Sequence, residues 1–380
     1  MQSDSSTLPE SAPFLRPLAF PRGQVARNSL WLAPLTNLQS EADGTLSDVE
    51  ERWLLRRAEG GFGVIETCAA YVQQSGKTWP GQLGVDRDEC LPRLRSLASG
   101  LRQRGALSIV QLFHGGARAS RALAGDLVSA TAHAVGDDHA RAATDEDLIG
   151  TIDSFRAAAL RVAAAGFDGV EIHGAHGYLP AQFLSRTNQR DDRWGGSLEN
   201  RARLLRTLVQ EVRRALPDHL VGVRLSPEDY GTVAGIDLDE TATVAGWLAA
   251  DGVDFVHASL WDHRQPSKKY PDEAPFQRIR AAVPLAIPVV AAGAFWTPAE
   301  ASRWMHWAEA LPAADGSGGA VAVALGSAAI VNPDWPAHAA QPGWEPTRLP
   351  VSAEHLAAVA VGAPFIDYLR RRRGFVADPA

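Results

Sequence analysis

Eight short, continuously apolar segments divide this chain, and longer amphipathic segments lie between them. Each apolar segment has hydrophobic residues at consecutive positions, which is typical of parallel strands buried on both faces. Eight strands interleaved with helices predict an α/β fold of the closed (β/α)8 TIM-barrel type, because an open doubly wound sheet has fewer strands. The predicted strands are 29–34, 62–66, 106–112, 167–172, 220–225, 253–258, 287–292 and 320–325, and predicted helices include 48–59, 90–103, 147–165, 197–215 and 239–250.

The turn after the first predicted strand argues against a dinucleotide-binding Rossmann domain. Such a domain carries Gly-x-Gly-x-x-Gly at this point, whereas this chain has Ala33-Pro34-Leu35-Thr36-Asn37, with no glycine. Barrels exceed 250 residues as one unit. We therefore expect one domain over residues 1–380, with the N-terminal segment 1–27 and the C-terminal helix and tail 352–380 packed on the barrel.

Composition excludes several classes of protein. A formal net charge of −7 gives no basis for a nucleic-acid or membrane partner, and no apolar run reaches the ~18 residues of a membrane span. Cys68 and Cys90 are the only cysteines, so a disulfide framework and a four-thiolate metal or iron–sulfur site are both excluded. Residues 1–11 lack the basic-then-apolar order of a signal peptide, which predicts a cytoplasmic location.

Three connections are longer than the barrel repeat requires. Residues 113–145 follow the third strand and 259–275 follow the sixth, on the face where barrels place their active sites. Loops of this length are usually functional or mobile. Residues 311–319 precede the eighth strand, so we expect a tolerated insertion at the opposite face.

The strongest chemical signal is Glu171-Ile-His173-Gly-Ala-His176-Gly-Tyr178, directly after the fourth predicted strand. Residues three apart on a strand point to opposite faces, so the histidines converge only if the chain turns, and Gly174 and Gly177 would permit that turn. Two imidazoles can then donate hydrogen bonds to a carbonyl oxygen, and a tyrosine with a pKa near 10 can hold a proton and release it to a carbanion.

Two other interpretations of the histidine pair stay open at this point. His-x-x-His is also a metal-binding pair, which would suit a metal-dependent hydrolase built on a barrel. Such sites usually need a third ligand, and no further His or Cys cluster stands out. Ordinary packing of both imidazoles is the other alternative.

Several stretches in a fixed order resemble the old yellow enzyme family of FMN-dependent ene-reductases. The segment 166–178 and the loop 183–201 with its Trp-Gly-Gly-Ser-Leu-Glu-Asn-Arg ending are the most specific, and coverage is roughly residues 14 to 375. In that loop, Ser197 is a suitable N-cap, and the alternating Arg and Asp residues are expected to pair with each other. The supporting stretches are Leu32–Asn37, Ile109–Arg118, Val223–Ser226, Val289–Gly293 and Ala324–Gly326.

The resemblance implies a set of FMN-binding positions at strand ends. The Thr36 hydroxyl would tune the flavin, the Gln111 amide would pair with its pyrimidine edge, and the Arg224 charge would stabilise the reduced N1–C2 region. Backbone N–H groups after the last two strands would hold the phosphate. The implied positions are Ala33, Pro34, Leu35, Thr36, Thr67, Gln111, Arg224, Gly293, Gly326 and Ser327.

The same resemblance implies a reaction and a substrate. His173 and His176 would bind the carbonyl of a small activated alkene, and Tyr178 would protonate its α-carbon after hydride from NADPH or NADH reaches the β-carbon through FMN. Arg373, in the ending Tyr368-Leu-Arg-Arg-Arg-Arg-Gly-Phe, matches an arginine that reaches into the neighbouring subunit of a homodimer; a solvated basic helix end is the alternative. An FMN-dependent oxidase or desaturase acting on an amine or natural-product intermediate is the alternative function.

Three positions depart from the family pattern. Thr36 stands where the bacterial members with a histidine pair carry cysteine, and Leu38 stands where those members tend to carry a tyrosine that contacts substrate. Ser327 stands where the family usually has an arginine on the FMN phosphate. Phosphate binding would then depend on backbone amides, the serine hydroxyl and another cation.

Overall fold

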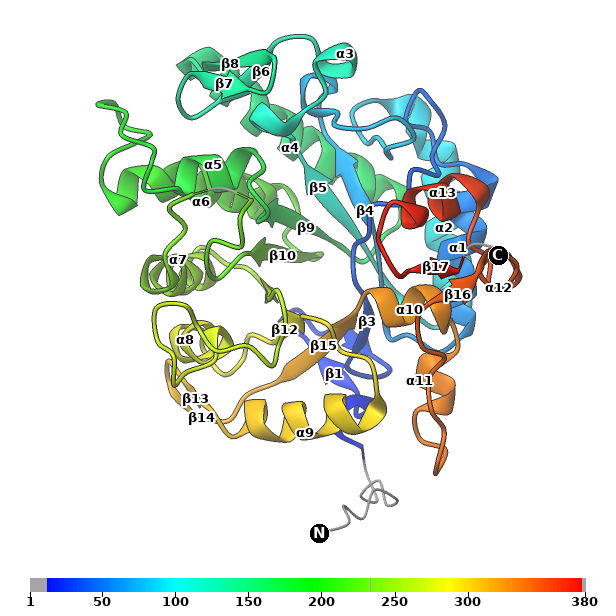
Figure 1. The fold of residues 1–380 in the computed structure, drawn as a ribbon. Helices are drawn as coiled ribbons and strands as arrows, with labels where there is room; N and C mark the ends of the chain where they lie inside the picture. The colour runs from blue at the N-terminus through cyan, green and yellow to red at the C-terminus, as the bar shows by residue number, and fades with distance from the viewer. Residues whose placement is uncertain (1–11, 233, 378–380) are drawn as a thin grey trace.

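A computed structural model of the chain describes residues 12–232 and 234–377 and shows a closed parallel barrel (Figure 1). The predicted barrel and all eight predicted strands are therefore confirmed. None of the described helices combines the length and the apolarity that a membrane span needs. Around the barrel the strands are β3 (Leu30–Leu32), β4 (Val64–Tyr71), β5 (Leu107–Phe113), β9 (Gly169–Gly174), β10 (Leu220–Leu225), β11 (Phe255–Ser259), β12 (Val289–Ala292) and β15 (Val321–Leu325).

Helices cover the outside of the barrel, and most begin at a residue that caps them. Ser47, Ser197 and Asp237 each accept backbone N–H groups of the first turn, and Thr144 and Thr297 form capping boxes. The predicted cap at Ser197 is thus confirmed. The covering helices are α1 (Asp48–Glu59), α2 (Leu91–Gln103), α4 (Asp145–Ala165), α6 (Leu198–Ala215), α7 (Leu238–Ala250), α8 (Pro275–Ala282) and α9 (Pro298–Glu309).

Short elements occupy the connections and the two ends of the barrel. The segment 113–145, expected to be a long loop, folds into a small three-stranded sheet at the rim, and 311–319 forms the β13–β14 hairpin before β15. The short strands are β1 (Leu18–Ala19), β2 (Val25–Ala26), β6 (Leu127–Ser129), β7 (His133–Val135), β8 (Asp138–Ala142), β13 (Pro312–Ala313), β14 (Gly316–Ser317), β16 (Val351–Ser352) and β17 (Val376–Ala377). The short helices are α3 (Arg121–Ala124), α5 (Leu179–Leu184), α10 (Ser327–Val331), α11 (Trp335–His338), α12 (Ala353–Ala358) and α13 (Ala363–Arg370).

Aromatic side chains fill the amino-terminal end of the barrel and make it a packed floor. The ring centroids of Trp31 and Phe255 lie 4.9 Å apart, and Phe20, which lies just before the β1–β2 turn, packs 6.2 Å from each of them. All three side chains are buried. Since the floor is closed, the carboxyl ends of the strands form the open end of the barrel, where barrels place their binding sites.

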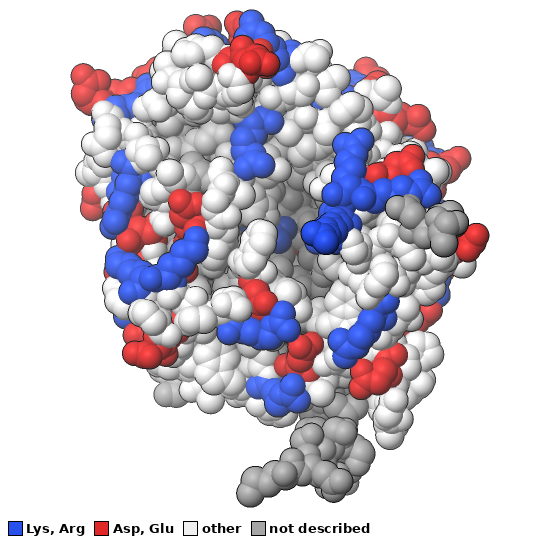
Figure 2. All heavy atoms as spheres, viewed as in Figure 1, with Lys and Arg blue, Asp and Glu red and all other residues white. Residues whose placement is uncertain are grey.

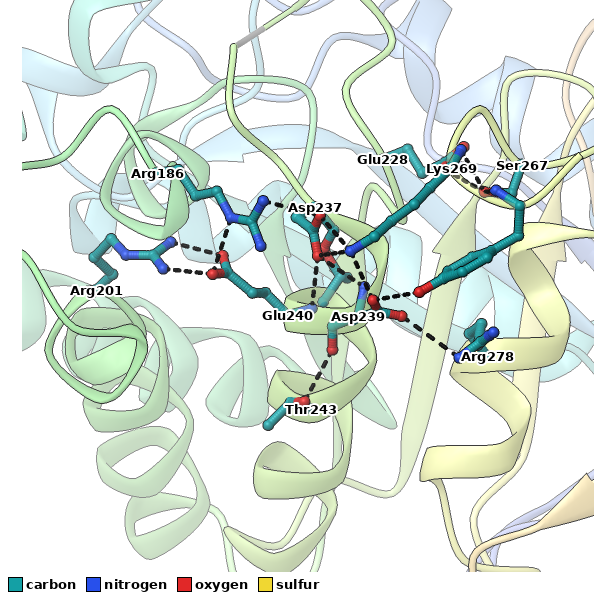
Figure 3. A network of polar contacts seen from close by, with 12 residues as sticks. Arg186, Arg201, Glu228, Asp237, Asp239, Glu240, Thr243, Ser267, Lys269 and Arg278 are labelled. Carbon is teal, nitrogen blue, oxygen red and sulfur yellow. Dashed lines mark hydrogen bonds and ion pairs between the residues drawn. The ribbon is translucent and has the colours of Figure 1, made fainter.

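A network of ion pairs joins the loops that follow β9, β10 and β11 (Figure 3). Arg201 holds Glu240 through two hydrogen bonds of 2.8 and 2.9 Å, and Arg186 bridges Glu240 and Asp237. Lys269 reaches Asp237 at 2.8 Å from the next loop. The expected pairing inside the segment 183–201 is found for Arg190 and Asp192. Arg186, Arg193 and Arg201 of that segment pair with acidic groups from other elements, so the network positions several loops at once.

Gly222 lies in β10 where a side chain would enter the aromatic floor. A Cβ at this position would lie 2.0 Å from Cζ of Phe255, so we expect Gly222→Ala to lower the free energy of unfolding by about 1–3 kcal/mol or more. Gly150→Ala, in α4 with no atom within 4 Å of the new Cβ, is the matched control and should gain up to ~1 kcal/mol. Denaturant melts measure both, and a Gly222→Ala protein as stable as the parent would contradict this packing.

Candidate active site

The carboxyl ends of the strands surround a cavity of about 250 Å³ at the mouth of the barrel. Eight of the predicted site residues line it together, although they come from distant parts of the sequence. This agrees with the expectation that functional residues of a barrel collect on the face formed by its strand-to-helix loops. The eight are Pro34, Leu35, Thr36, Gln111, His173, His176, Tyr178 and Arg224.

The other predicted residues lie outside the lining of this cavity. Ala33 is buried at the end of β3, and the Thr67 hydroxyl turns into the wall to donate to the Cys68 carbonyl at 2.9 Å. Ala69 lines the cavity on that side, after an irregularity in the β4–β5 register. Gly293, Gly326 and Ser327 follow β12 and β15 on the same rim, and Arg373 is exposed beyond α13.

A tight turn brings the two histidines and the tyrosine together. The ring centroids of His173 and His176 lie 5.0 Å apart, and the ring of Tyr178 lies 5.0 Å from that of His173. His176 itself has a φ of 58° and Gly177 one of 73°. Gly174 remains in β9, where a side chain would press on the Arg224 carbonyl at 3.0 Å. The turn was therefore correctly predicted at Gly177, but its other left-handed residue is His176 rather than Gly174.

Hydrogen bonds define which ring nitrogen of each histidine carries the proton. The backbone N–H of Ala175 donates to Nδ1 of His173 at 3.2 Å, so the proton is on Nε2. Arg224 donates to the Ser259 hydroxyl oxygen at 3.0 Å, and Nε2 of His176 lies 2.7 Å from the same oxygen. The Ser259 hydroxyl has no other acceptor for its hydrogen among the described residues, so we assign that hydrogen to His176 Nε2, which leaves Nδ1–H as the donor of that imidazole.

Burial determines the charge of the three side chains. It lowers the pKa of both His173 and His176 well below the usual histidine range, so the two rings are neutral donors at physiological pH. Burial also raises the pKa of Tyr178, whose phenol therefore retains its proton. The Tyr178 hydroxyl has no hydrogen-bond partner among residues 12–232 and 234–377, which leaves that proton available to a ligand.

Below the cavity, the barrel interior holds a layer of buried polar side chains. Glu171 accepts a hydrogen bond from Gln111 Nε2 at 2.6 Å and lies 2.8 Å from Nδ1 of His257. Because the amide nitrogen of Gln111 faces Glu171, its oxygen is the atom left for an N–H group in the cavity. Glu66 is fully buried beside them, and no donor group of the described residues forms a hydrogen bond to either of its oxygens.

The residues at the mouth fit a flavin ring. Arg224 is a permanent cation that is only 6% exposed, and its Nε has no hydrogen-bond partner within the described residues. A buried cation of this kind suits the negative N1–C2 region of a reduced flavin, and the Gln111 oxygen suits its N3–H. Gly326 and Ser327 begin α10, where the first backbone N–H groups have no acceptor within the helix.

Several lining residues were not predicted from the sequence. They include Trp79 from the loop after β4, Ile330 from α10, and Phe365, Tyr368, Leu369 and Arg372 from the C-terminal segment. The buried Arg57 holds that region in place by donating to the Ile330 and Val359 carbonyls, each at 2.7 Å. An arginine among the apolar positions of a predicted helix must find buried hydrogen-bond acceptors. Arg57 was therefore the one sequence feature that could have indicated this region.

The described residues contain one group with the spacing of metal ligands, namely Glu66, Glu171 and His257 inside the barrel. His173 and His176 are not part of it. In place of a third ligand, the histidine pair has the Tyr178 ring and Ser259 beside it.

Residues 15–343 match the profile of the NADH:flavin oxidoreductase / NADH oxidase family. The chain belongs to this family. A Bacillus subtilis (strain 168) protein named probable NADH-dependent flavin oxidoreductase YqiG is 34% identical over 86% of this chain and 87% of its own length. The structure of an old yellow enzyme homologue from Zymomonas mobilis aligns with a TM-score of 0.73 and 26% identity, covering 86% of this chain and 91% of that one.

A third relative is longer than this chain. The NADH:fumarate oxidoreductase of Klebsiella pneumoniae (strain 342) is 33% identical over 86% of this chain, which spans only 36% of that protein. Together these similarities confirm the old yellow enzyme family and an oxidoreductase that uses FMN and a reduced nicotinamide.

The buried Glu66 carboxyl provides a test of the polar layer. Burial, followed by the charge of Glu171, raises the pKa of Glu66 well above its usual value, so the folded protein keeps a proton that the unfolded chain releases near pH 4.3. Wild-type stability should therefore fall as pH rises from that point, by up to about 1.4 kcal/mol per pH unit. Glu66→Gln removes this pH-dependent loss of stability. The melting temperature of the variant should therefore rise relative to that of the wild type as the pH increases.

Glu171→Gln is the matched control for that measurement. The pKa of Glu171 is lowered, with His257 and Arg224 favouring its charged form, so its stabilisation is present above the unfolded pKa and is lost in acid. We expect this variant to be less stable than wild type at neutral pH. A difference between Glu66→Gln and wild type that stays constant from pH 5 to 9 would show that Glu66 is not the buried proton carrier.

Proposed function

We propose that the protein is an FMN-dependent ene-reductase that reduces small activated alkenes with NADH or NADPH. The observation that carries the proposal is the convergence of two neutral imidazole donors and one protonated phenol over a cavity that also contains Arg224 and Gln111. Bound FMN supplies the redox chemistry, because it accepts hydride from reduced nicotinamide and passes hydride to the β-carbon of the alkene.

His173 and His176 bind the electron-withdrawing group of the substrate. Their N–H groups donate to its carbonyl or nitro oxygen, and these bonds strengthen as negative charge builds up on that oxygen. Neutral imidazoles suit this task because each has one N–H fixed by a neighbour, Ala175 for His173 and Ser259 for His176. The site is therefore arranged before the substrate enters.

Tyr178 donates the proton that completes the reduction at the α-carbon. Its phenol lies next to His173, keeps its proton at neutral pH and has no hydrogen-bond partner among the described residues. The guanidinium of Arg118 lies 5.1 Å from the centre of the Tyr178 ring and favours the phenolate that remains after transfer. Solvent then returns the proton to the tyrosine.

Other expectations from the sequence stay proposals. Ala33, Thr67, Gly293, Gly326 and Ser327 are proposed to complete the FMN site with the residues of the cavity. Residues 1–380 are proposed to form one domain, although 1–11 and 378–380 lie outside the described residues. A cytoplasmic homodimer in which Arg373 enters the neighbouring site is likewise proposed; Arg373 is exposed in the single chain.

Absorbance of the purified protein tests the proposal directly. We expect oxidised-flavin bands that bleach when NADH or NADPH is added without oxygen, and that return when 2-cyclohexenone is added. Bleaching without reoxidation by enones, maleimides or nitroalkenes would favour an oxidase or desaturase instead. A colourless protein that cannot be reconstituted with FMN would overturn both functions.

The role of Tyr178 is tested by separating the two half-reactions. Tyr178→Phe should slow enone reduction by roughly 100-fold or more, since the proton donor is lost, while leaving flavin bleaching by nicotinamide nearly unchanged. Tyr270→Phe, which removes a phenol from the loop after β11, should change neither rate. Stopped-flow absorbance measures both, and an equal loss in the two half-reactions of Tyr178→Phe would rule out proton donation.

A further inference from the structure

The inner cavity opens into a wider outer cavity of about 810 Å³. The two share Thr36, Trp79, Tyr178 and Tyr368, so they adjoin at these four side chains. The outer cavity is large enough for a second chemical group attached to the reacting part of the ligand. The residues that line the outer cavity therefore influence which ligands the enzyme accepts.

Arginines line this passage without carboxylate partners. Arg118 and Arg371 line the outer cavity and Arg372 lines the inner one, and none of the three forms an ion pair within the described residues. The one acidic residue in either lining is Asp367, which pairs with Arg370. Figure 2 shows Lys and Arg side chains around the central hollow of a protein whose net charge is −7.

The positions of these arginines are defined by contacts that leave donors unused. Nη1 of Arg118 donates to the carbonyls of His176 at 3.1 Å and Thr232 at 3.3 Å, while its Nε and Nη2 have no partner in the described structure. The Arg372 guanidinium lies 5.3 Å from the ring centre of Phe375. Backbone and aromatic contacts thus hold these groups at the mouth while their charge remains uncompensated.

The geometry points to an anion-binding site, formed by Arg118, Arg371 and Arg372, for a carboxylate or phosphate group on the ligand whose reactive part occupies the inner cavity. Guanidinium groups bind both anions through paired N–H donors. The anion has two sources: a carboxylate on the alkene itself, or the phosphates of the nicotinamide dinucleotide. This inference rests on the proposed function and names the ligand class for the same site.

The test compares ligands that differ only in charge, using the FMN-loaded enzyme. The inhibition constant or KM for fumarate is measured beside that for dimethyl fumarate, its neutral ester, and 2-cyclohexenone reports the basal reaction. The dissociation constants of NADH and NADPH come from the reductive half-reaction. The variants are Arg371→Gln and Arg372→Gln; both side chains are exposed and form no ion pair in the described structure, so their replacement puts folding at little risk.

We expect each substitution to weaken binding of the anionic ligand roughly tenfold or more. The constants for dimethyl fumarate and 2-cyclohexenone should change little. Weaker fumarate binding identifies the alkene carboxylate as the source, and weaker dinucleotide binding identifies the phosphates. Added salt should reduce the wild-type preference for the anion. Arg156→Gln, an exposed arginine of α4 paired with Asp153, is the charge-matched control and should leave every constant unchanged.

Two results would overturn the inference. One is unchanged binding of fumarate and of both dinucleotides in Arg371→Gln and Arg372→Gln. The other is an equal loss for fumarate and dimethyl fumarate, which would indicate a change of shape rather than of charge. Failure of the wild type to reduce 2-cyclohexenone or any other activated alkene would count against the proposed function, whereas these binding constants test only the arginines.

Discussion

The guanidinium of Arg224 remains charged wherever the fold places it, and the fold buries it at the mouth of the barrel. A buried charge is costly unless neighbouring groups compensate it. Glu171 supplies the opposite charge from the adjacent strand, and the Ser259 hydroxyl accepts a hydrogen bond from the guanidinium. The Nε of Arg224 is buried without a hydrogen-bond partner among the described residues, and it suits the electron-rich edge of a reduced flavin.

The same interaction organises the groups on either side of it. Glu171 also accepts from Gln111, which orients that amide toward the flavin edge, and Ser259 also contacts His176, which defines the tautomer on the substrate side. Glu66 must then be neutral, because a second carboxylate charge next to Glu171 would be repelled. Flavin-facing and substrate-facing residues are therefore connected through a single buried polar layer.

Much of this arrangement was visible in the sequence for identifiable reasons. The strands were predicted because continuous apolar runs are buried on both faces, and the histidine turn because glycines flank a strand end. Glu66 was overlooked although a carboxylate inside an apolar run is itself a signal of a buried polar group. Phe365 and Arg372 carried no such signal, because nothing in a C-terminal segment indicates which cavity it will cover.

The sequence by itself determined the barrel, the family and the identity of the groups that can do the chemistry, because periodicity and strand-end motifs are local properties. Only the tertiary structure decided how these groups act. Closing the barrel brought Arg224, Ser259 and His176 into one chain of hydrogen bonds, and burial made both site histidines neutral donors. The C-terminal segment placed Arg371 and Arg372 in the walls of the two adjoining cavities, the outer of which Arg118 also lines. Tautomers, pKa shifts and cavity walls depend on neighbours that are distant in sequence, and only the packed fold determines which neighbours those are.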